Sequence, residues 1–172
     1  MVTNEELRAR IVEEAARSTW GDLWPRVIGG RAELLAAFEG VSEVQARWRP
    51  PSGEGEAAWS ALEVARHIQA YTRNVLAIIE ATARGEPAPK DPPGALAEAP
   101  TLADARLAAL EASTLLSSVH ERLPEPPNLD VTVPHAFFGP LNCREWYAFL
   151  RLHDWDHRRQ LERLKEMPGL PK

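Results

Sequence analysis

The stretch FLRLHDWDHRRQLERL, residues 149–164, places two histidines four positions apart in a segment with helical periodicity. Each residue of an α-helix advances by about 100° around the helix axis. The apolar residues that fall within about 60° of Trp146 form one stripe, and they are Phe149, Leu150, Leu161 and Leu164. His153 and His157 lie about 20° to either side of the centre of this stripe. Both histidines therefore belong to the face that packs into the interior.

Two buried imidazoles need hydrogen-bond partners, because an unpaired buried polar group costs about 1–3 kcal/mol. Histidines at i and i+4 project side by side, so one metal ion can satisfy both rings. The residues alone leave another interpretation open. In it, His153 and His157 are core histidines bonded to backbone, water or a neighbouring acid.

A third candidate ligand, His67, lies in the segment WSALEVARHIQAY. It is on the flank of that segment's apolar stripe, about 70° from the middle, and can still turn inward. Ser60 and Glu63 have the spacing of a capping box, and Trp59 before them is expected to pack on Val64 as a hydrophobic staple. The helix that carries His67 is therefore anchored at its start, which suits a metal ligand.

Capping boxes predict where the helices begin, because each satisfies two free backbone N–H groups. Strong matches are Thr3–Glu6, Ser60–Glu63 and Asn142–Glu145, with weaker ones at Ser42–Gln45 and Thr101–Asp104. The predicted helices span about 3–17, 22–39, 60–84, 101–123 and 142–166. Most of the 15 prolines fall between these segments, where they cannot disrupt a helix. The stretch LDVTV alternates like a strand, but no partner strand is evident, so we interpret it as loop.

The fold class predicted from this pattern is all-α, a four-helix bundle with an extra N-terminal helix. We expect residues 1–20 to form a helical extension and residues 21–168 to form the bundle domain. The proline-rich connection between the second and third bundle helices is long enough to cross the bundle, so simple up-and-down connectivity is not required.

Composition excludes several functional classes. The formal charge of −5 provides no basic surface for nucleic acid or for a membrane. A single cysteine rules out an internal disulfide. The polar N-terminus lacks a signal-peptide core, and no apolar run is long enough to span a membrane, so we expect a cytoplasmic protein. Motifs for a P-loop, a dinucleotide-binding loop and a serine nucleophile elbow are missing from the sequence.

Together, WSALEVARHIQAY and FGPLNCREWYAFLRLHDWDHRRQLERL resemble the DinB/YfiT-like family of metal-dependent bacterial proteins over about residues 22–166. The resemblance implies a four-helix bundle with a long crossover between the second and third helices. It also implies a divalent metal held by three histidines, here His67, His153 and His157. Characterised relatives include transferases and isomerases that use a low-molecular-weight thiol, and relatives are commonly homodimers.

Two mechanisms follow if three imidazoles leave a metal position open. The metal can present a thiol as thiolate to a small-molecule electrophile, or it can activate water to hydrolyse an ester or amide. Zinc, nickel, iron and manganese are not distinguished by the sequence. The resemblance favours a thiol-dependent transferase. The alternatives are a hydrolase and a non-catalytic binding or stress-response protein that the metal stabilises.

Further candidates have simpler structural interpretations. Asp154 and Asp156 lie at the stripe's edge, where a solvated salt bridge is favoured over a contact to a ligand histidine. Cys143 is interpreted as a small packed residue and His135 as a loop residue. Near the end of the third bundle helix, His120 is interpreted as a capping or exposed residue, and Thr114 and Ser117 either line a cavity or are exposed hydroxyls. Trp155, opposite the stripe, is expected to pack against a second subunit or the N-terminal helix.

Overall fold

A computed structural model describes residues 3–90 and 99–172. Its α-helices are α1 (Asn4–Ala16), α2 (Trp20–Ala36), α3 (Glu43–Arg47), α4 (Ala61–Ala83), α5 (Leu102–Ser118) and α6 (Cys143–Glu166). Short 3₁₀ turns span Gly55–Ala58 and Val119–Arg122, and the strands are β1 (Thr132–His135) and β2 (Gly139–Asn142). The structure is predominantly helical, which confirms the predicted fold class.

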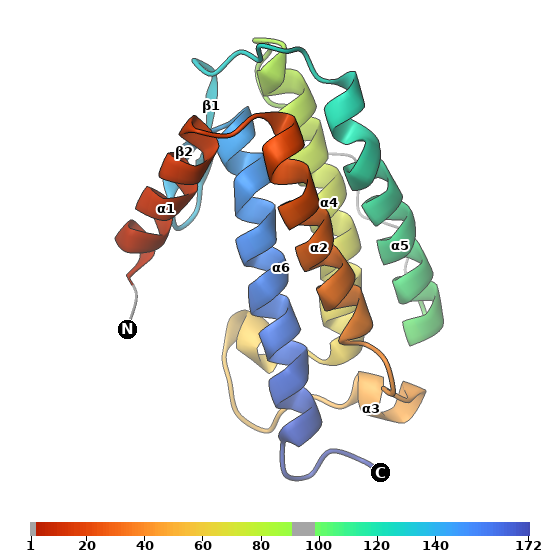
Figure 1. Cartoon of the computed structure of the whole chain (residues 1–172). Coiled ribbons are helices and arrows are strands. Elements are labelled where there is room, and N and C mark those ends of the chain that lie inside the picture. The colour runs from red at the N-terminus through yellow and green to blue at the C-terminus, as the bar shows by residue number, and fades with distance from the viewer. Residues whose placement is uncertain (1–2, 91–98) are drawn as a thin grey trace.

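Helices α2, α4, α5 and α6 pack as a bundle in which α2 and α4 each contact both α5 and α6. Figure 1 shows that α2 and α6 run in one direction and that α4 and α5 run in the other. Because α4 ends at the opposite end of the bundle from the start of α5, the chain must return along the bundle between them. The predicted crossover includes residues 91–98, which lie outside the described residues.

The predicted helix starts are formed by local hydrogen bonds. The boxes at Thr3, Ser42, Ser60, Thr101 and Asn142 all have both of their reciprocal bonds. A further box, between Thr19 and Asp22, was not predicted, and it starts α2 at Trp20 rather than at residue 22. The helix predicted over residues 101–123 is shorter in the structure. It is α5, which ends at Ser118 and continues only as a 3₁₀ turn.

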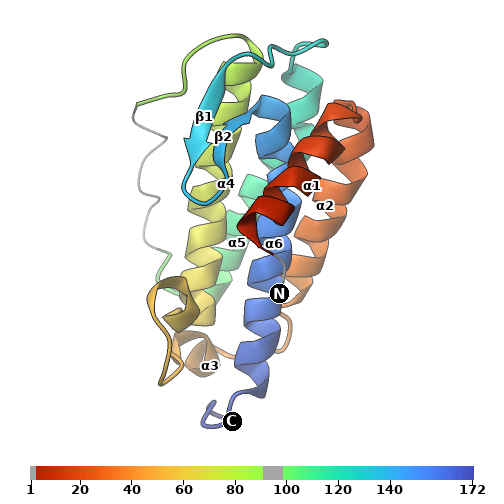
Figure 2. The same ribbon diagram turned by 90° about the vertical axis from the view of Figure 1, so that its left-hand side faces the viewer.

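The interpretation of LDVTV as loop was wrong for its last residues, because β1 and β2 form an antiparallel hairpin. The partner strand, GPLN, contains glycine and proline and so carries no strand signal. Gly139 has a φ of +68°, a conformation that glycine adopts without steric cost. The hairpin is held by the Trp146 indole, which donates to the Val133 carbonyl, and by Arg8 of α1, which donates to the Phe138 carbonyl. Figure 2 shows it lying over α4 and the first half of α6.

The interior consists of two hydrophobic clusters separated by a layer of buried polar residues. The cluster nearer the hairpin includes Val27, Val75, Leu116 and Leu150, and the other includes Leu34, Ile68, Ala109 and Leu161. Between them along each bundle helix lies at least one buried polar side chain, and these are Arg31, Gln69, Thr72, Ser113, Asp154, His157 and Gln160. We call this set the polar layer. It crosses the whole bundle at the level of the histidines.

The outer face of α6 is partly covered by α1. On this face Tyr147 is fully buried and packs edge-on against Trp20. Trp155 remains 45% exposed. It borders a groove between α1, α2 and α6 that also includes Ile11 and Arg151. A homodimer remains a prediction, as does the division into an extension and a bundle domain.

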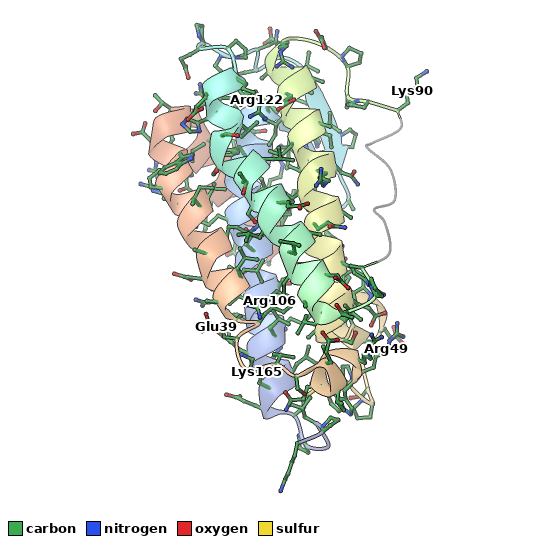
Figure 3. The ribbon with its side chains drawn as sticks, turned by 90° about the vertical axis from the view of Figure 1, so that its right-hand side faces the viewer. Glu39, Arg49, Lys90, Arg106, Arg122 and Lys165 are labelled. Atoms are coloured by element: carbon green, nitrogen blue, oxygen red, sulfur yellow. The ribbon has the colours of Figure 1, made fainter. Side chains whose placement is uncertain are left out.

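Polar contacts between neighbouring segments link the chain at both ends of the bundle. Figure 3 shows Glu39 and Lys165 at one end, where the Lys165 ammonium donates to the Glu39 carbonyl, and Arg122 at the other, where it pairs with Glu80. Among the residues described, no helix combines the length and apolar character needed to cross a bilayer.

Candidate metal centre

His67, His153 and His157, the three ligands that the family resemblance implies, come together in the bundle. His67 is on the second turn of α4, and the other two are in the middle of α6. The Nε2 atoms of His67 and His153 are 3.0 Å apart. One nitrogen from each of the three rings lies within 4.8 Å of the others.

These separations fit a single ion. Metal–nitrogen bonds of about 2.0–2.1 Å in a tetrahedral site place ligand nitrogens about 3.3 Å apart. Imidazole nitrogens suit zinc, copper, iron and nickel. In residues 3–90 and 99–172, no carboxylate or thiol joins the three-histidine group, so the donor set leaves at least one position for another ligand.

Burial keeps the rings of His67 and His153 neutral. It lowers the pKa of His67 to about 3, with further lowering from the neighbouring His153 and His157. The pKa of His153 falls to about 4, again because burial disfavours the charged ring, although a hydrogen bond to Asp154 opposes the shift. A metal ligand must be the neutral imidazole. Both rings are therefore in the ligating state at neutral and mildly acidic pH.

The remaining ring nitrogens of the two α6 histidines have different partners. His157 Nδ1 lies 2.9 Å from the side-chain oxygen of Gln160, whose amide in turn donates to the backbone carbonyl of Glu56. His153 Nδ1 lies 3.3 Å from Asp154 Oδ1. Because each Nδ1 faces an oxygen acceptor, each ring carries its proton there and leaves Nε2 free. This tautomer directs Nε2 toward the centre of the site.

The expectation of a solvated salt bridge was wrong for Asp154. Its carboxylate is fully buried and pairs with Arg31 of α2. A bundle helix contacts two neighbours, so its buried arc is wider than the apolar stripe alone. Asp156 is exposed as expected, and among the described residues the nearby Arg158 pairs with Glu33 and Glu162.

Two aromatic side chains form walls of the site. Tyr71 stacks on His153 at 4.2 Å between ring centroids, with an interplanar angle of 8°. Trp59 lies 4.9 Å from the His67 ring and is nearly parallel to His157 at 6.3 Å. Trp59 was expected only as a staple on Val64, and no role at the site was predicted for Tyr71. The spacing of Tyr71, one helical turn after His67, was the available signal.

His135 is closer to the site than its loop interpretation suggested. It is half-buried at the end of β1, and its ring packs against Phe138, Phe149 and Trp146. Its Nδ1 accepts the Phe137 backbone N–H, so Nε2 carries the proton and faces the Tyr71 hydroxyl at 3.5 Å. The hairpin thereby places the polar ring of His135 next to the Tyr71 hydroxyl.

Other candidates lie apart from the histidines. Cys143 is buried and donates to the Asn128 carbonyl, and burial raises the pKa of its thiol to about 11 despite its place at a helix start. His120 packs against Trp24. Thr114 is exposed, and both Thr114 and Ser117 donate to carbonyls of their own helix.

Comparison with known proteins agrees with the resemblance seen in the motifs. No curated protein and no solved structure matches the chain. The family model of the DinB superfamily matches residues 27–161, a span that contains all three histidines. Because this match covers most of the 172 residues, the chain belongs to the DinB superfamily.

Proposed function

We propose that this protein is a metal-dependent enzyme whose His67, His153 and His157 hold a divalent ion, and that it transfers a low-molecular-weight thiol to a small electrophilic substrate. The observation that carries the proposal is the convergence of three imidazoles, of which burial keeps those of His67 and His153 neutral, with no acidic or thiol side chain in their group among the described residues. Such a donor set is typical of catalytic sites, whereas structural zinc sites usually have four protein ligands.

A bound divalent ion would supply Lewis acidity, lowering the pKa of a coordinated thiol or water. The chain's own residues would hold and enclose the reactants. His153 and His157 present Nε2 because their other nitrogens are engaged by side-chain oxygens. Tyr71 and Trp59 form apolar walls beside these rings, which limit the access of bulk water.

An external thiol is favoured over a protein thiol. Cys143 is the chain's single cysteine, and burial keeps it protonated and inaccessible. Sulfur chemistry in this protein therefore requires a thiol from solution. The aromatic walls suit the apolar part of an electrophile, and the hydroxyl of Tyr71, close to His135, can donate a hydrogen bond to it.

Metal content is the first test. Protein purified without added ions should contain about one divalent ion per chain, and His153→Ala should lose it. His120→Ala is the matched control, because that ring packs against Trp24 away from the site. At a metal concentration 100-fold above Kd, binding stabilises by about 2.7 kcal/mol, which raises the Tm by about 5–11 °C. Equal metal content in both variants would contradict the ligand assignment.

A second test separates catalysis from stabilisation. Cobalt(II) would be loaded into the protein and titrated with a small thiol such as glutathione. Direct coordination predicts a new thiolate-to-metal charge-transfer band, absent from His153→Ala. A metal that binds and stabilises without any spectral response to thiols or any turnover of electrophiles would favour the non-catalytic alternative. Hydrolysis of activated esters without a thiol would favour a hydrolase.

A further inference from the structure

A buried ion pair lies directly behind one of the candidate metal ligands. Arg31 of α2 donates to both carboxylate oxygens of Asp154 of α6, at 2.7 and 3.0 Å. Their side chains are 2% and 0% exposed. Removing two charges from water is costly, and apolar residues of similar volume often serve stability equally well. Stability alone is therefore a weak reason for this pair.

The pair is connected to the candidate site by a third contact of Asp154. Its Oδ1 atom lies 3.3 Å from Nδ1 of His153, while Nε2 of the same ring faces His67 at 3.0 Å. Arg31 is restrained in turn, because it also donates to the Ser113 hydroxyl of α5, which donates to the Ala109 carbonyl. The contacts form one chain through the polar layer, from α5 through α2 to the imidazole.

The two α6 histidines differ in a way that gives this chain a chemical role. His157 faces the neutral amide oxygen of Gln160, whereas His153 faces a carboxylate. Metal-bound histidines commonly donate their other N–H to such a carboxylate, which sets the tautomer and the ring orientation and raises the basicity of the ligand. Of the two α6 histidines, His153 is thus the one whose donor strength the protein can adjust more.

We infer that Asp154 and Arg31 are positioning residues of the metal centre: Asp154 holds the Nδ1–H of His153, and Arg31 holds Asp154. The inference rests on the proposed metal binding. It assigns to α2, which supplies none of the three histidines, control over the affinity and donor strength of the site. Ser113 extends this control to α5.

The main experiment replaces the whole pair with apolar residues. The double variant Arg31→Met, Asp154→Leu removes both charges together, so neither is left unpaired in the core. It should fold with a Tm near that of the metal-free wild type but bind metal about 10- to 100-fold more weakly. Its cobalt(II) absorption spectrum should also shift, because His153 loses its acceptor.

The matched control is an ion pair that also joins α2 and α6 but faces solvent. Glu33 and Arg158 are 2.6 Å apart, and the double variant Glu33→Leu, Arg158→Met should keep the metal affinity and spectrum of the wild type. If the buried double variant also keeps both, the inference is wrong. Equal weakening in the two double variants would also overturn it, since only helix packing would then matter.

A measurement on the unmodified protein covers the case in which the buried variant fails to fold. Nitrogen-15 histidine spectra of the metal-free protein should show His153 with its proton on Nδ1. A proton on Nε2 would overturn the inference. The tautomer is read without metal, so it is tested even if the wild type proves to bind no ion, a result that would count against the proposed function itself.

Discussion

Acidification of the metal-free protein should destabilise it at a pH where ordinary carboxylates are still ionised. The pKa values of His67 and His153 lie at about 3 and 4, well below the ordinary 6.5, mainly because of burial. At a pH between these lowered values and 6.5, the two imidazoles bind protons in the unfolded chain but not in the folded chain. Stability therefore falls as the pH falls, starting near 6.5.

The size of the effect follows from proton linkage. Between pH 7 and pH 5, each imidazole that titrates only in the unfolded state removes about 1.9 kcal/mol from the free energy of unfolding. The two rings together remove on the order of 4 kcal/mol, a large part of the roughly 5–15 kcal/mol typical of a domain. Carboxylates with lowered pKa values, such as that of Asp154, add to the loss only at lower pH.

Urea unfolding in the presence of a chelator, at half-unit steps from pH 7 to pH 5, measures this loss. The double variant His67→Gln, His153→Gln is the control, because glutamine is polar but does not titrate. His135, whose pKa burial also lowers, contributes equally to both proteins. The wild type should lose several kcal/mol more than the variant. Parallel pH profiles would refute the assignment of two neutral, buried rings.

Three further predictions concern the scaffold. Ser60→Ala removes the capping box of α4 and should cost about 1 kcal/mol in urea unfolding, whereas Ser52→Ala in an exposed loop should cost almost nothing. Cys143 should react with a disulfide reagent only after unfolding, and a native rate equal to the unfolded rate would contradict its buried position. Ile79→Ala should cost about 2–5 kcal/mol, against less than about 0.5 kcal/mol for exposed Leu107→Ala, both measured by urea unfolding.

The candidate site was predictable to the extent that it depends on local geometry. His153 and His157 share a face because of helical periodicity alone, and the cap at Ser60 fixes where the helix of His67 begins. The residues alone made His67 a candidate third ligand, and the family resemblance then implied that it is one. Its position on the flank of an apolar stripe did not by itself bring it to α6.

Contacts between distant segments could not be predicted in the same way. Asp154 was placed at the edge of a stripe, but whether an edge faces solvent or a neighbouring helix depends on the order of helices in the bundle. Asp154 can be buried because it pairs with Arg31, which is 123 residues away in the sequence. Likewise, β2 has no strand propensity and exists because β1 and the start of α6 provide partners for it.

The sequence by itself determined where the helices begin, which faces are apolar and that two histidines project together, because capping and periodicity act within a few residues. Only the tertiary structure decided that His67 meets them, that Tyr71 and Trp59 enclose the rings, and that a buried ion pair stands behind His153. These features arise where segments far apart in sequence pack against one another, and no local interaction specifies such neighbours.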